Sequence, residues 1–373
     1  MRPTDDCTSC EAIAGSAVLK LPYIVAEIGL NHDGDYGRAC RLIWEAAKAG
    51  ANAVKFQYVK ADRLVARSAP PYFHQAGAPA ETQHEFFRRS DALDRHDYEC
   101  LKEECYLAGV DFLCTVFDVE SIHWIAPLVP AFKVASADIT NIPLLKAVAS
   151  YKKPVYLSTG AATKADVNHA YRILRVGDGT CSDQFRGVSA IDIIPMHCVL
   201  SYPTPVDQAN LGMIPPLQEY QGWPRGYSDH TLFYLDVLTT AWLLGATVIE
   251  KHFTLDKMLP GNDHYHSMDP TDLRALVAKL KELQAMIGDG EKRVLPIEEA
   301  ARLNARQSWH YARDLQPGHM IQEGDVVLKR PAGGWPPERS PVGLTVESVV
   351  LADEPVTLVV RTCDKTQSQT KLK

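Results

Sequence analysis

Eight short apolar segments alternate with longer helical patterns along most of this chain, and this alternation limits the possible folds more than any other feature. The eight segments are residues 23–27, 53–57, 111–115, 131–135, 154–158, 192–197, 226–228 and 248–252. Helical patterns lie between them, for example at residues 36–49, which stop at Gly50, and after Asp94, where the pattern stops at Gly109. Strands that alternate with helices form parallel sheets, and eight such units can close into a barrel. We therefore predict an α/β fold, a (β/α)8 barrel, over residues 21–287.

An open, doubly wound sheet is the alternative arrangement for the same strands and helices. Dinucleotide-binding proteins of that class carry G-x-G-x-x-G in the first turn between strand and helix. This chain has Gly29, Gly34 and Gly37 there, at a different spacing. The dinucleotide fingerprint is therefore absent.

The character of the sequence changes after the last helical pattern, which indicates a second domain. Residues 288–305 are charged and contain proline, so we predict a linker there. Beyond it, short runs are separated by turn signals such as Pro317-Gly318, and we predict a small, mostly β domain over residues 306–373. Residues 1–20 are predicted to be a disordered or irregular extension. Two domains also agree with a length of 373 residues.

Charge and hydropathy argue against several classes of function. The net charge of −7 disfavours nucleic acid as the main partner. No run of about 18 apolar residues is present, so neither a membrane-spanning helix nor a membrane partner is expected. The N-terminus contains Asp5, Asp6 and Glu11 and lacks an apolar block, so we expect no signal peptide and a cytoplasmic location. Cys7 and Cys10 form a lone C-x-x-C motif without partners that would identify a zinc or redox site.

Two of the predicted strands end in histidine. One segment, Gly-Tyr-Ser-Asp-His, ends at His230, and another, Val-Ile-Glu-Lys-His, ends at His252. A stretch long enough for one helix separates them, so adjacent parallel strands would bring both imidazoles to the carboxyl edge of the barrel, where barrel enzymes have their active sites. Such a pair can bind one divalent ion and leave positions open for a substrate. The two segments alone are equally compatible with hydrogen-bonded histidines that bind no metal.

Nearly all of the remaining predicted strands also end in polar side chains. An ordinary barrel interior would carry branched apolar residues at these positions. Lys55 and Lys133 would supply positive charge, while the hydroxyls of Thr115, Ser136 and Ser158 would supply neutral hydrogen-bond donors. Buried lysine is costly unless it is paired or used. These five side chains together predict a site for a small phosphorylated anion. Further polar residues at the strand ends are Glu27, Gln57, Asp138, Ser228 and Glu250.

Taken together, these strand ends resemble the sialic acid synthase family, which comprises bacterial N-acetylneuraminate synthases and their legionaminate, pseudaminate and spore-coat relatives. The motifs that carry the resemblance are Ala26-Glu27-Ile28-Gly29 with Asn31-His32, Val54-Lys55-Phe56-Gln57, Phe132-Lys133-Val134-Ala135-Ser136, Leu157-Ser158-Thr159-Gly160, His197-Cys198 with Tyr202-Pro203, Tyr227-Ser228-Asp229-His230-Thr231 and Glu250-Lys251-His252-Phe253-Thr254. They occur in family order. The tail from Arg306 resembles the antifreeze-like (SAF) domain of the same enzymes, including Lys329-Arg330-Pro331.

The resemblance implies a TIM barrel whose C-terminal SAF domain is swapped between the two subunits of a homodimer. It implies condensation of phosphoenolpyruvate with the open-chain aldehyde of an N-acetylmannosamine-type amino sugar. The products would be a 2-keto-3-deoxy acid and phosphate. The resemblance also implies a divalent metal cofactor, Mn²⁺ in the first place, with Mg²⁺ or Co²⁺ as alternatives.

The family pattern further implies roles for individual residues. His230 and His252 would bind the metal ion. The catalytic residues would be Glu27, Lys55, Lys133 and Glu250, and our hypothesis is that Glu27 is the base that handles the attacking water. The residues that would bind or line the substrates are Gln57, Thr115, Ser136, Asp138, Ser158, Tyr202, Ser228, Asp263 and Arg330, of which Arg330 would reach the active site of the other subunit.

Four departures from the family pattern stand out, of which the first three fall where the sugar would lie and the fourth, at Ala332, falls in the lid. Val199-Leu200 follows the His-Cys pair where a polar pair is usual, and Asp138 stands where the family often has glutamate. Asn262 replaces the proline of Gly-Pro-Asp, and Ala332 interrupts the Arg-Pro-Gly pattern. We therefore expect an intact phosphoenolpyruvate site and an altered sugar site.

The altered sugar site leaves the acceptor open. A diacetamido-trideoxyhexose, an unacetylated hexose or another aldehyde sugar are the alternatives, and apolar Val199-Leu200 suits a deoxy position. His264 and His266 follow Asp263, and they are either further metal or hydroxyl contacts or histidines of a surface loop.

Two other classes of function remain as alternatives. Metal-dependent hydrolysis or isomerisation would need a third protein ligand and no phosphate site, which Lys55 and Lys133 argue against. A non-catalytic protein that binds carbohydrate or phosphoenolpyruvate would be expected to have lost the histidine pair, and the pair is intact.

Overall fold

The structure is a computed structural model that describes residues 19–71, 82–176, 191–220, 224–261, 263–357 and 359–360. Nearly all of the predicted N-terminal extension, including Cys7 and Cys10, lies outside the described residues, and so does Asn262. The chain divides into two compact units, Met1–Gly290 and Glu291–Lys373. Within the described part of the chain, no helix is both long enough and apolar enough to cross a membrane.

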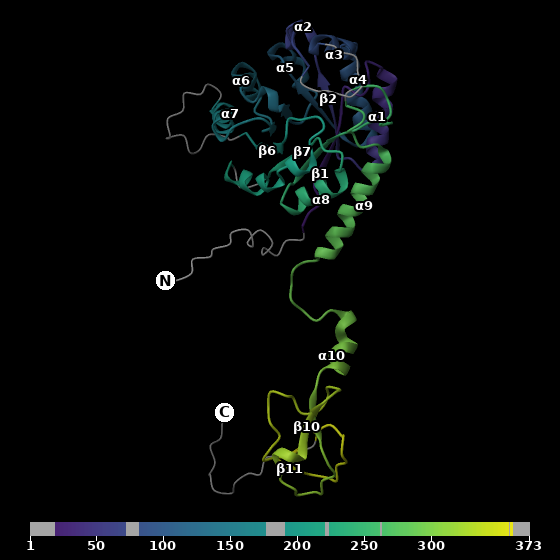
Figure 1. Ribbon diagram of the computed structural model, residues 1–373, viewed down its shortest axis with the longest axis vertical. Helices are drawn as coiled ribbons and strands as arrows, with labels where there is room; N and C mark the ends of the chain where they lie inside the picture. Colours follow the sequence, from purple (N-terminus) through teal and green to yellow (C-terminus); the bar gives the residue numbers. More distant parts are fainter. Residues whose placement is uncertain are drawn as a thin grey trace. The chain divides into compact units, whose positions relative to one another are not determined.

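The first unit is built on a closed barrel of eight parallel strands, as predicted (Figure 1). The strands are β1 (Tyr23–Gly29), β2 (Ala53–Tyr58), β3 (Asp111–Val116), β4 (Phe132–Val134), β5 (Val155–Ser158), β6 (Ile193–Cys198), β7 (Gly226–Asp229) and β8 (Val248–His252). Each strand pairs with the next one in sequence, and β1 pairs with β8 to close the barrel. The fold is therefore a (β/α)8 TIM barrel.

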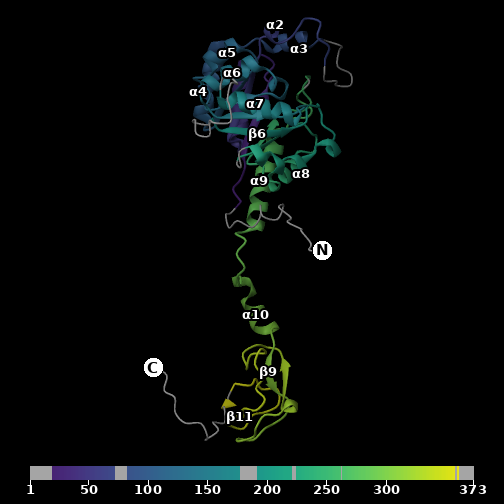
Figure 2. The ribbon, with the colours of Figure 1, turned by 90° about the vertical axis from the view of Figure 1, so that its left-hand side faces the viewer.

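Helices cover the outside of the strands in both Figure 1 and Figure 2. The helices of this unit are α1 (Tyr36–Ala49), α2 (Ala61–Leu64), α3 (Gln83–Ser90), α4 (Arg95–Ala108), α5 (Val119–Ile125), α6 (Ile142–Ser150), α7 (Lys164–Val176), α8 (Tyr234–Leu243) and α9 (Pro270–Ile287). Of these, α2 and α3 lie at one end of the barrel in Figure 1 and Figure 2, where Phe86 and Phe87 of α3 line a cavity. Gly50 and Gly109 end α1 and α4 in the left-handed region, at φ 103° and 76°, which confirms both predicted ends. Asp94 caps α4 by accepting a hydrogen bond from the Asp97 N–H.

The interior of the barrel changes from apolar to polar along the strands. An apolar cluster fills the amino-terminal part and consists of Val25, Ala53, Leu113, Ala131, Ile194, Met196 and Val248. Side chains two residues apart share a face of a strand. The residues two positions beyond members of this cluster are Glu27, Lys55, Thr115, Lys133, Cys198 and Glu250. Because the cluster fills the barrel below them, these polar side chains line a space that opens at the carboxyl end.

The connection from β6 to β7 differs from the other crossovers in its described part. Short 3₁₀ turns replace an α-helix there: η2 (Val206–Gln208), η3 (Leu211–Met213) and η4 (Pro215–Tyr220). Pro203, Pro205, Pro215 and Pro216 explain this, because proline lacks the N–H group that a helix interior needs. The start of this connection carries Tyr202 to the barrel mouth.

The second unit has its own apolar core, formed by Tyr311, Leu315, Ile321, Val326, Val346, Val350 and Val356. β9 (Ser308–Tyr311) pairs with β10 (Val326–Lys329), and β11 (Thr345–Val346) pairs with β12 (Val359–Val360), both antiparallel. The segment predicted to be a linker contains α10 (Glu299–Ala305). Its sequence, Glu-Ala-Ala-Arg-Leu-Asn-Ala, is rich in residues that favour a helix. The Leu303 carbonyl of this helix accepts a hydrogen bond from the Ala332 N–H, in the second unit, at 2.8 Å. This helix therefore belongs to the second unit.

Candidate active site

One cavity at the carboxyl end of the barrel gathers most of the predicted site residues. Those that line it are Glu27, Lys55, Gln57, Thr115, Lys133, Ser136, Ser158, Tyr202, Ser228, His230, Glu250, His252 and Asp263. They come from all eight strands or from the loops that follow them. Closure of the barrel therefore brings together side chains that are far apart in the sequence.

Two lysines and two glutamates alternate in this cavity and neutralise one another. Lys55 Nζ lies 2.8 Å from Glu27 Oε2 and 3.5 Å from Glu250 Oε1. Lys133 Nζ lies 3.2 Å from the same Glu250 oxygen. The four side chains are at most 6% exposed. Burying an unpaired charge in this cavity would cost free energy, so each lysine and glutamate needs an oppositely charged neighbour to remain ionised there.

The network shifts the pKa values of its members in different directions. Burial raises the pKa of Glu27, although the charge of Lys55 opposes this. Burial would also raise the pKa of Glu250, but the charges of Lys133 and Lys55 lower it to about 2. Burial lowers the pKa of Lys133, and the attraction of Glu250 offsets only part of this. Glu250 is therefore the firmly ionised carboxylate, whereas Glu27 accepts a proton more readily.

Hydroxyl groups and one glycine shape the side of the cavity near β3, β4 and β5. Lys55 Nζ donates a hydrogen bond to Thr115 Oγ1 at 3.1 Å, and the Gly160 N–H donates one to Ser136 Oγ at 3.0 Å. Ser158 Oγ is buried and has no hydrogen-bond partner among the described residues. Buried hydroxyl groups are normally hydrogen-bonded, so the Ser158 hydroxyl is available to a bound ligand.

His230 and His252 line the same cavity, with ring centroids 5.7 Å apart. His230 Nδ1 lies 2.8 Å from the carbonyl oxygen of Val199. Because a carbonyl only accepts, this nitrogen carries a proton, and Nε2 is the nitrogen of His230 that could bind a metal ion. Burial holds the pKa of His252 well below its ordinary value, so its imidazole is neutral. Neutral imidazoles bind metal ions, and the pair therefore fits two ligands of one divalent ion.

The pair is not completed by a third protein ligand in the described structure. Among the described residues, no group of three or more His, Cys, Asp or Glu side chains is arranged to hold a metal ion. Two imidazoles would leave the other coordination positions to water or substrate, as catalytic metal sites do. Asp263 Oδ2 lies 3.7 Å from His252 Nδ1. This distance is too long for a hydrogen bond, and His252 Nδ1 has no hydrogen-bond partner among the described residues, so Asp263 acts on this ring through its charge.

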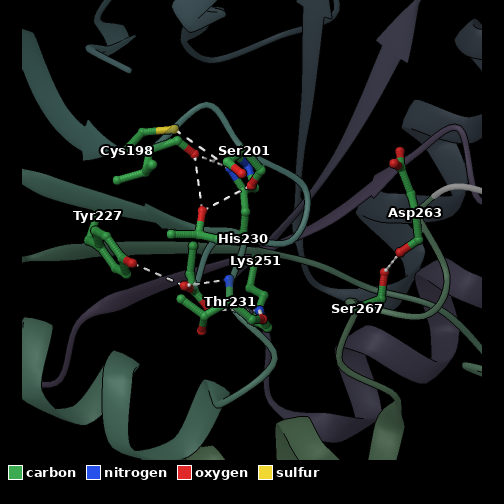
Figure 3. Close-up of polar contacts among 11 residues, drawn as sticks. Cys198, Ser201, Tyr227, His230, Thr231, Lys251, Asp263 and Ser267 are labelled. Atoms are coloured by element: carbon green, nitrogen blue, oxygen red, sulfur yellow. Dashed lines mark hydrogen bonds and ion pairs between the residues drawn. The ribbon is translucent and has the colours of Figure 1, made fainter. Parts of the chain in front are cut away.

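The prediction that His264 and His266 belong to a surface loop is wrong, because both are buried. The loop folds back over β8, and within it Ser267 Oγ donates a hydrogen bond to the Asp263 carbonyl at 2.5 Å (Figure 3). His266 packs against the ring of His252, with centroids 4.9 Å apart, and its Nε2 lies 3.6 Å from Asp263 Oδ1. The histidine-rich motif was the signal for this contact, but its burial was not visible in the sequence.

One predicted site residue of the barrel, Asp138, does not line the cavity, and the prediction for Arg330 stays a prediction. Asp138 lies in a 3₁₀ turn, η1 (Ser136–Asp138), and accepts a hydrogen bond from the Asn141 side chain at 3.1 Å. Its side chain therefore stabilises the start of α6 instead of facing the cavity. Arg330 belongs to the second unit, which is described by itself.

The sequence analysis did not identify the apolar part of the cavity wall. That part includes Leu30, Phe86, Phe87, Phe117, Ala137 and Leu200, of which only Leu200 was singled out. Phe86 and Phe87 come from α3, where no motif pointed to the site. Phe117 directly follows β3, and its position after a strand was a usable signal.

A closed parallel barrel with paired charges and two imidazoles at its carboxyl end defines an enzyme of the TIM-barrel class. The charges suit an anionic substrate, and the imidazoles suit a divalent cation.

Comparison with known proteins identifies the family. Residues 42–292 match the model of the NeuB family. The chain is 37% identical to N,N'-diacetyllegionaminic acid synthase of Legionella pneumophila, over 84% of this chain and 87% of the relative. It is 35% identical to the synthase of the same name from Campylobacter jejuni, over 85% and 92% of the two chains. The crystal structure of N-acetylneuraminic acid synthetase from Leptospira borgpetersenii, in complex with citrate, is 31% identical with a TM-score of 0.63, and the match covers 76% of this chain and 90% of that one.

This chain therefore belongs to the NeuB family, in agreement with the predicted resemblance. It is an enzyme of the transferase class, a nonulosonic acid synthase. Enzymes of this family generally depend on a metal ion, and the histidine pair has the chemistry to hold one.

Proposed function

We propose that this synthase condenses phosphoenolpyruvate with the open-chain aldehyde of an N-acylated amino sugar. The products are a 2-keto-3-deoxy acid and phosphate. The observation that carries the proposal is the single cavity in which two buried lysines lie close to two imidazoles. Membership of the NeuB family supports the same reaction.

The lysines and hydroxyls hold phosphoenolpyruvate. Lys55 and Lys133 attract its phosphate and carboxylate, while Thr115, Ser136 and Ser158 offer hydroxyl groups. Each lysine is already paired with a glutamate, at 2.8 Å for Lys55 and 3.2 Å for Lys133. Binding of the anion therefore exchanges contacts to glutamate for contacts to substrate, and the lysines are never buried without a partner.

His230 and His252 hold the divalent metal ion, for which we propose Mn²⁺, with Mg²⁺ and Co²⁺ as alternatives. When bound, the ion acts as a Lewis acid that polarises the aldehyde. The protein orients the ring of His230 through its Nδ1 nitrogen, which meets the Val199 carbonyl. The Asp263 carboxylate lies 3.7 Å from Nδ1 of His252, and its negative charge favours a cation at that imidazole.

The reaction forms a bond from carbon 3 of phosphoenolpyruvate to the aldehyde carbon, which leaves carbon 2 electron-poor, and the aldehyde oxygen takes up a proton to become a hydroxyl. Water then adds to carbon 2 and loses one proton. The resulting carbon 2 hydroxyl loses its proton to form the ketone as the carbon–oxygen bond to phosphate breaks, and the phosphate leaves with that proton. Glu27 is the proposed base for this proton, because burial raises its pKa and Gln57 Nε2 holds it at 2.7 Å. Glu250 stays ionised and keeps both lysines in place.

Two acceptor sugars are candidates. The first is an N-acetylmannosamine-type hexose, as the family resemblance implies. The second is a diacetamido-trideoxyhexose, which Leu200 favours because this apolar side chain lines the cavity and suits a deoxy carbon. The Legionella and Campylobacter relatives, both named N,N'-diacetyllegionaminic acid synthases, also favour the second.

We assign residues 306–373 to an SAF domain that is exchanged between the subunits of a homodimer. Arg330 of each subunit would then contact the acyl group of the sugar in the other active site. The separate core of the second unit and the Lys329-Arg330-Pro331 motif support this assignment.

Release of phosphate from phosphoenolpyruvate with Mn²⁺, measured across a panel of aldehyde sugars, tests the reaction. Release with N-acetylmannosamine would identify the first acceptor, and release only with the diacetamido-trideoxyhexose would identify the second. A chelator should abolish release in either case. Protein that binds a divalent ion yet releases no phosphate with any sugar would contradict the synthase reaction and favour a binding role.

Glu27→Gln tests the proposed base. We predict that this variant lowers kcat by about 100-fold or more while the KM for phosphoenolpyruvate changes little, because the amide keeps the shape but cannot take the proton. Exposed Glu103→Gln on α4 is the control and should leave both constants unchanged. A normal rate of phosphate release by Glu27→Gln would remove Glu27 from this role.

A further inference from the structure

A second ion pair lies behind the imidazoles, on the outer face of the same two strands. Lys251 Nζ is 2.6 Å from Asp229 Oδ2, and the two side chains are 1% and 0% exposed. Because side chains alternate along a strand, both point away from the cavity that His230 and His252 line. Helix α8 contacts β7 and β8 on this side. The proposed reaction makes no use of the pair.

The pair is hydrogen-bonded to the end of β7 at several points. Asp229 accepts from the Tyr227 hydroxyl at 3.0 Å, from the Thr231 N–H at 3.0 Å and from the Thr231 hydroxyl at 3.1 Å. Lys251 donates a further bond to the Thr231 carbonyl at 2.7 Å. Figure 3 shows Tyr227, Thr231 and Lys251 gathered beside His230. Lys251, on β8, is therefore bonded to both sequence neighbours of His230.

The strand register places this network directly next to both imidazoles. Asp229 lies opposite Lys251 in the parallel pairing of β7 and β8. The next residue is His230 in one strand and His252 in the other. A slip of one strand end against the other would therefore change the 5.7 Å separation of the two rings.

Stability alone does not account for an ion pair at this position. Apolar residues of similar size are often at least as stabilising as a buried ion pair. The surroundings would accept such residues, because Tyr227, Ile249 and Leu238 belong to the apolar core outside the barrel. An apolar pair would lack the directional bonds that fix one strand end relative to the other.

We propose that Asp229 and Lys251 are positioning residues that fix the separation of His230 and His252 and thereby set the affinity of the site for a divalent cation. The inference rests on the metal-binding role proposed above for these histidines. Asp229 and Lys251 act only through the two imidazoles.

The test compares Lys251→Met with a double variant, Asp229→Asn with Lys251→Met, in the full chain. The double variant removes both charges and so leaves no buried charge unpaired. Lys153→Met is the matched control, because Lys153 Nζ also donates two hydrogen bonds, here to the backbone carbonyls of Ala126 and Val129, but at another part of the barrel. Mn²⁺ affinity is measured by the electron paramagnetic resonance signal of free Mn²⁺, phosphoenolpyruvate affinity by calorimetry, and Tm by thermal unfolding.

We expect Lys251→Met to weaken Mn²⁺ binding by about tenfold or more, as changes behind metal ligands do. The double variant should have a higher Tm than Lys251→Met and should still bind Mn²⁺ weakly. Phosphoenolpyruvate affinity should stay within about twofold, because Lys55 and Lys133 are untouched. Lys153→Met should lower Tm without changing Mn²⁺ affinity.

Unchanged Mn²⁺ affinity in Lys251→Met would overturn the inference, and so would recovery of Mn²⁺ affinity together with Tm in the double variant. Both results would leave the proposed reaction intact. Wild-type protein that binds none of Mn²⁺, Mg²⁺ and Co²⁺ would instead remove the metal-binding role of the histidines, and the inference with it.

Discussion

The charged side chains inside this barrel are stabilised by their oppositely charged neighbours and not by solvent. The pKa of Lys133 is lowered, mainly by burial. The pKa of Lys55 is raised in spite of burial, because Glu250 and Glu27 attract its proton. Of the two lysines that hold the anionic substrate in the proposed function, Lys133 therefore loses its charge first as the pH rises.

We predict that the KM for phosphoenolpyruvate increases on the alkaline side, at pH values below the ordinary lysine pKa of about 10.4. Lys133→Arg keeps its charge throughout this range and should remove the increase. Lys279→Arg, at an exposed position of α9, is the control. Steady-state kinetics between about pH 7 and about pH 10 measures the effect. An alkaline increase that persists in Lys133→Arg would show that another group is responsible.

Gly160 offers a second test at a single residue. A Cβ atom there would lie 2.8 Å from Ser136 Oγ and 3.2 Å from the Leu200 nitrogen, closer than atoms normally approach. We predict that Gly160→Ala displaces the Ser136 hydroxyl and raises the KM for phosphoenolpyruvate by about fivefold, as the loss of about 1 kcal/mol implies. In Gly212→Ala the new Cβ would meet nothing within 4 Å, so the KM should not change. Equal constants for the two variants would argue against a substrate contact by Ser136.

At the scale of secondary structure, side chains close in the sequence determine where a helix begins. In α4, Asp94 accepts a hydrogen bond from the Asp97 N–H, and Asp97 accepts one from the Asp94 N–H at 2.8 Å. We predict that Asp94→Ala lowers the free energy of unfolding by about 1 kcal/mol and leaves the kinetic constants unchanged, because α4 covers the outside of the barrel. Urea unfolding measures the change, with exposed Glu103→Ala in the same helix as control. Equal losses in both variants would mean that the cap is not the cause.

Among the described residues, the second unit has an apolar core of its own, which shares no residue with the core around the barrel. We predict that a chain ending at Gly290 folds by itself and binds phosphoenolpyruvate and Mn²⁺ as the full chain does. Its KM for the sugar should be raised, because it lacks Arg330. Circular dichroism and calorimetry report folding and binding, and Arg330→Ala in the full chain should reproduce the change in KM.

Two outcomes would contradict this prediction in different ways. A truncated chain that fails to fold would show that the barrel depends on the second unit. A folded truncated chain with a normal KM for the sugar would contradict the proposed role of Arg330.

Local patterns in the chain were sufficient for the barrel and for the polar layer at its mouth. Strand periodicity placed Lys55 and Gln57 on one face of β2, and it placed Glu250 and Lys251 on opposite faces of β8. Side chains alternate along any strand, whatever the distant contacts are. Helix ends at Gly50 and Gly109 were predictable for the same reason, since they depend on the backbone freedom of one residue.

Tertiary contacts decided the rest. His266 is buried against His252 because its loop folds back over β8, and Phe86 reaches the cavity from a helix that carries no motif. Asp138 faces Asn141 instead of the cavity. The positions of His266 and Phe86 depend on how their segments pack against the barrel, and the residues next to them in the chain carry no information about that packing. For Asp138 the deciding contact is local, because Asn141 is only three residues away and caps α6.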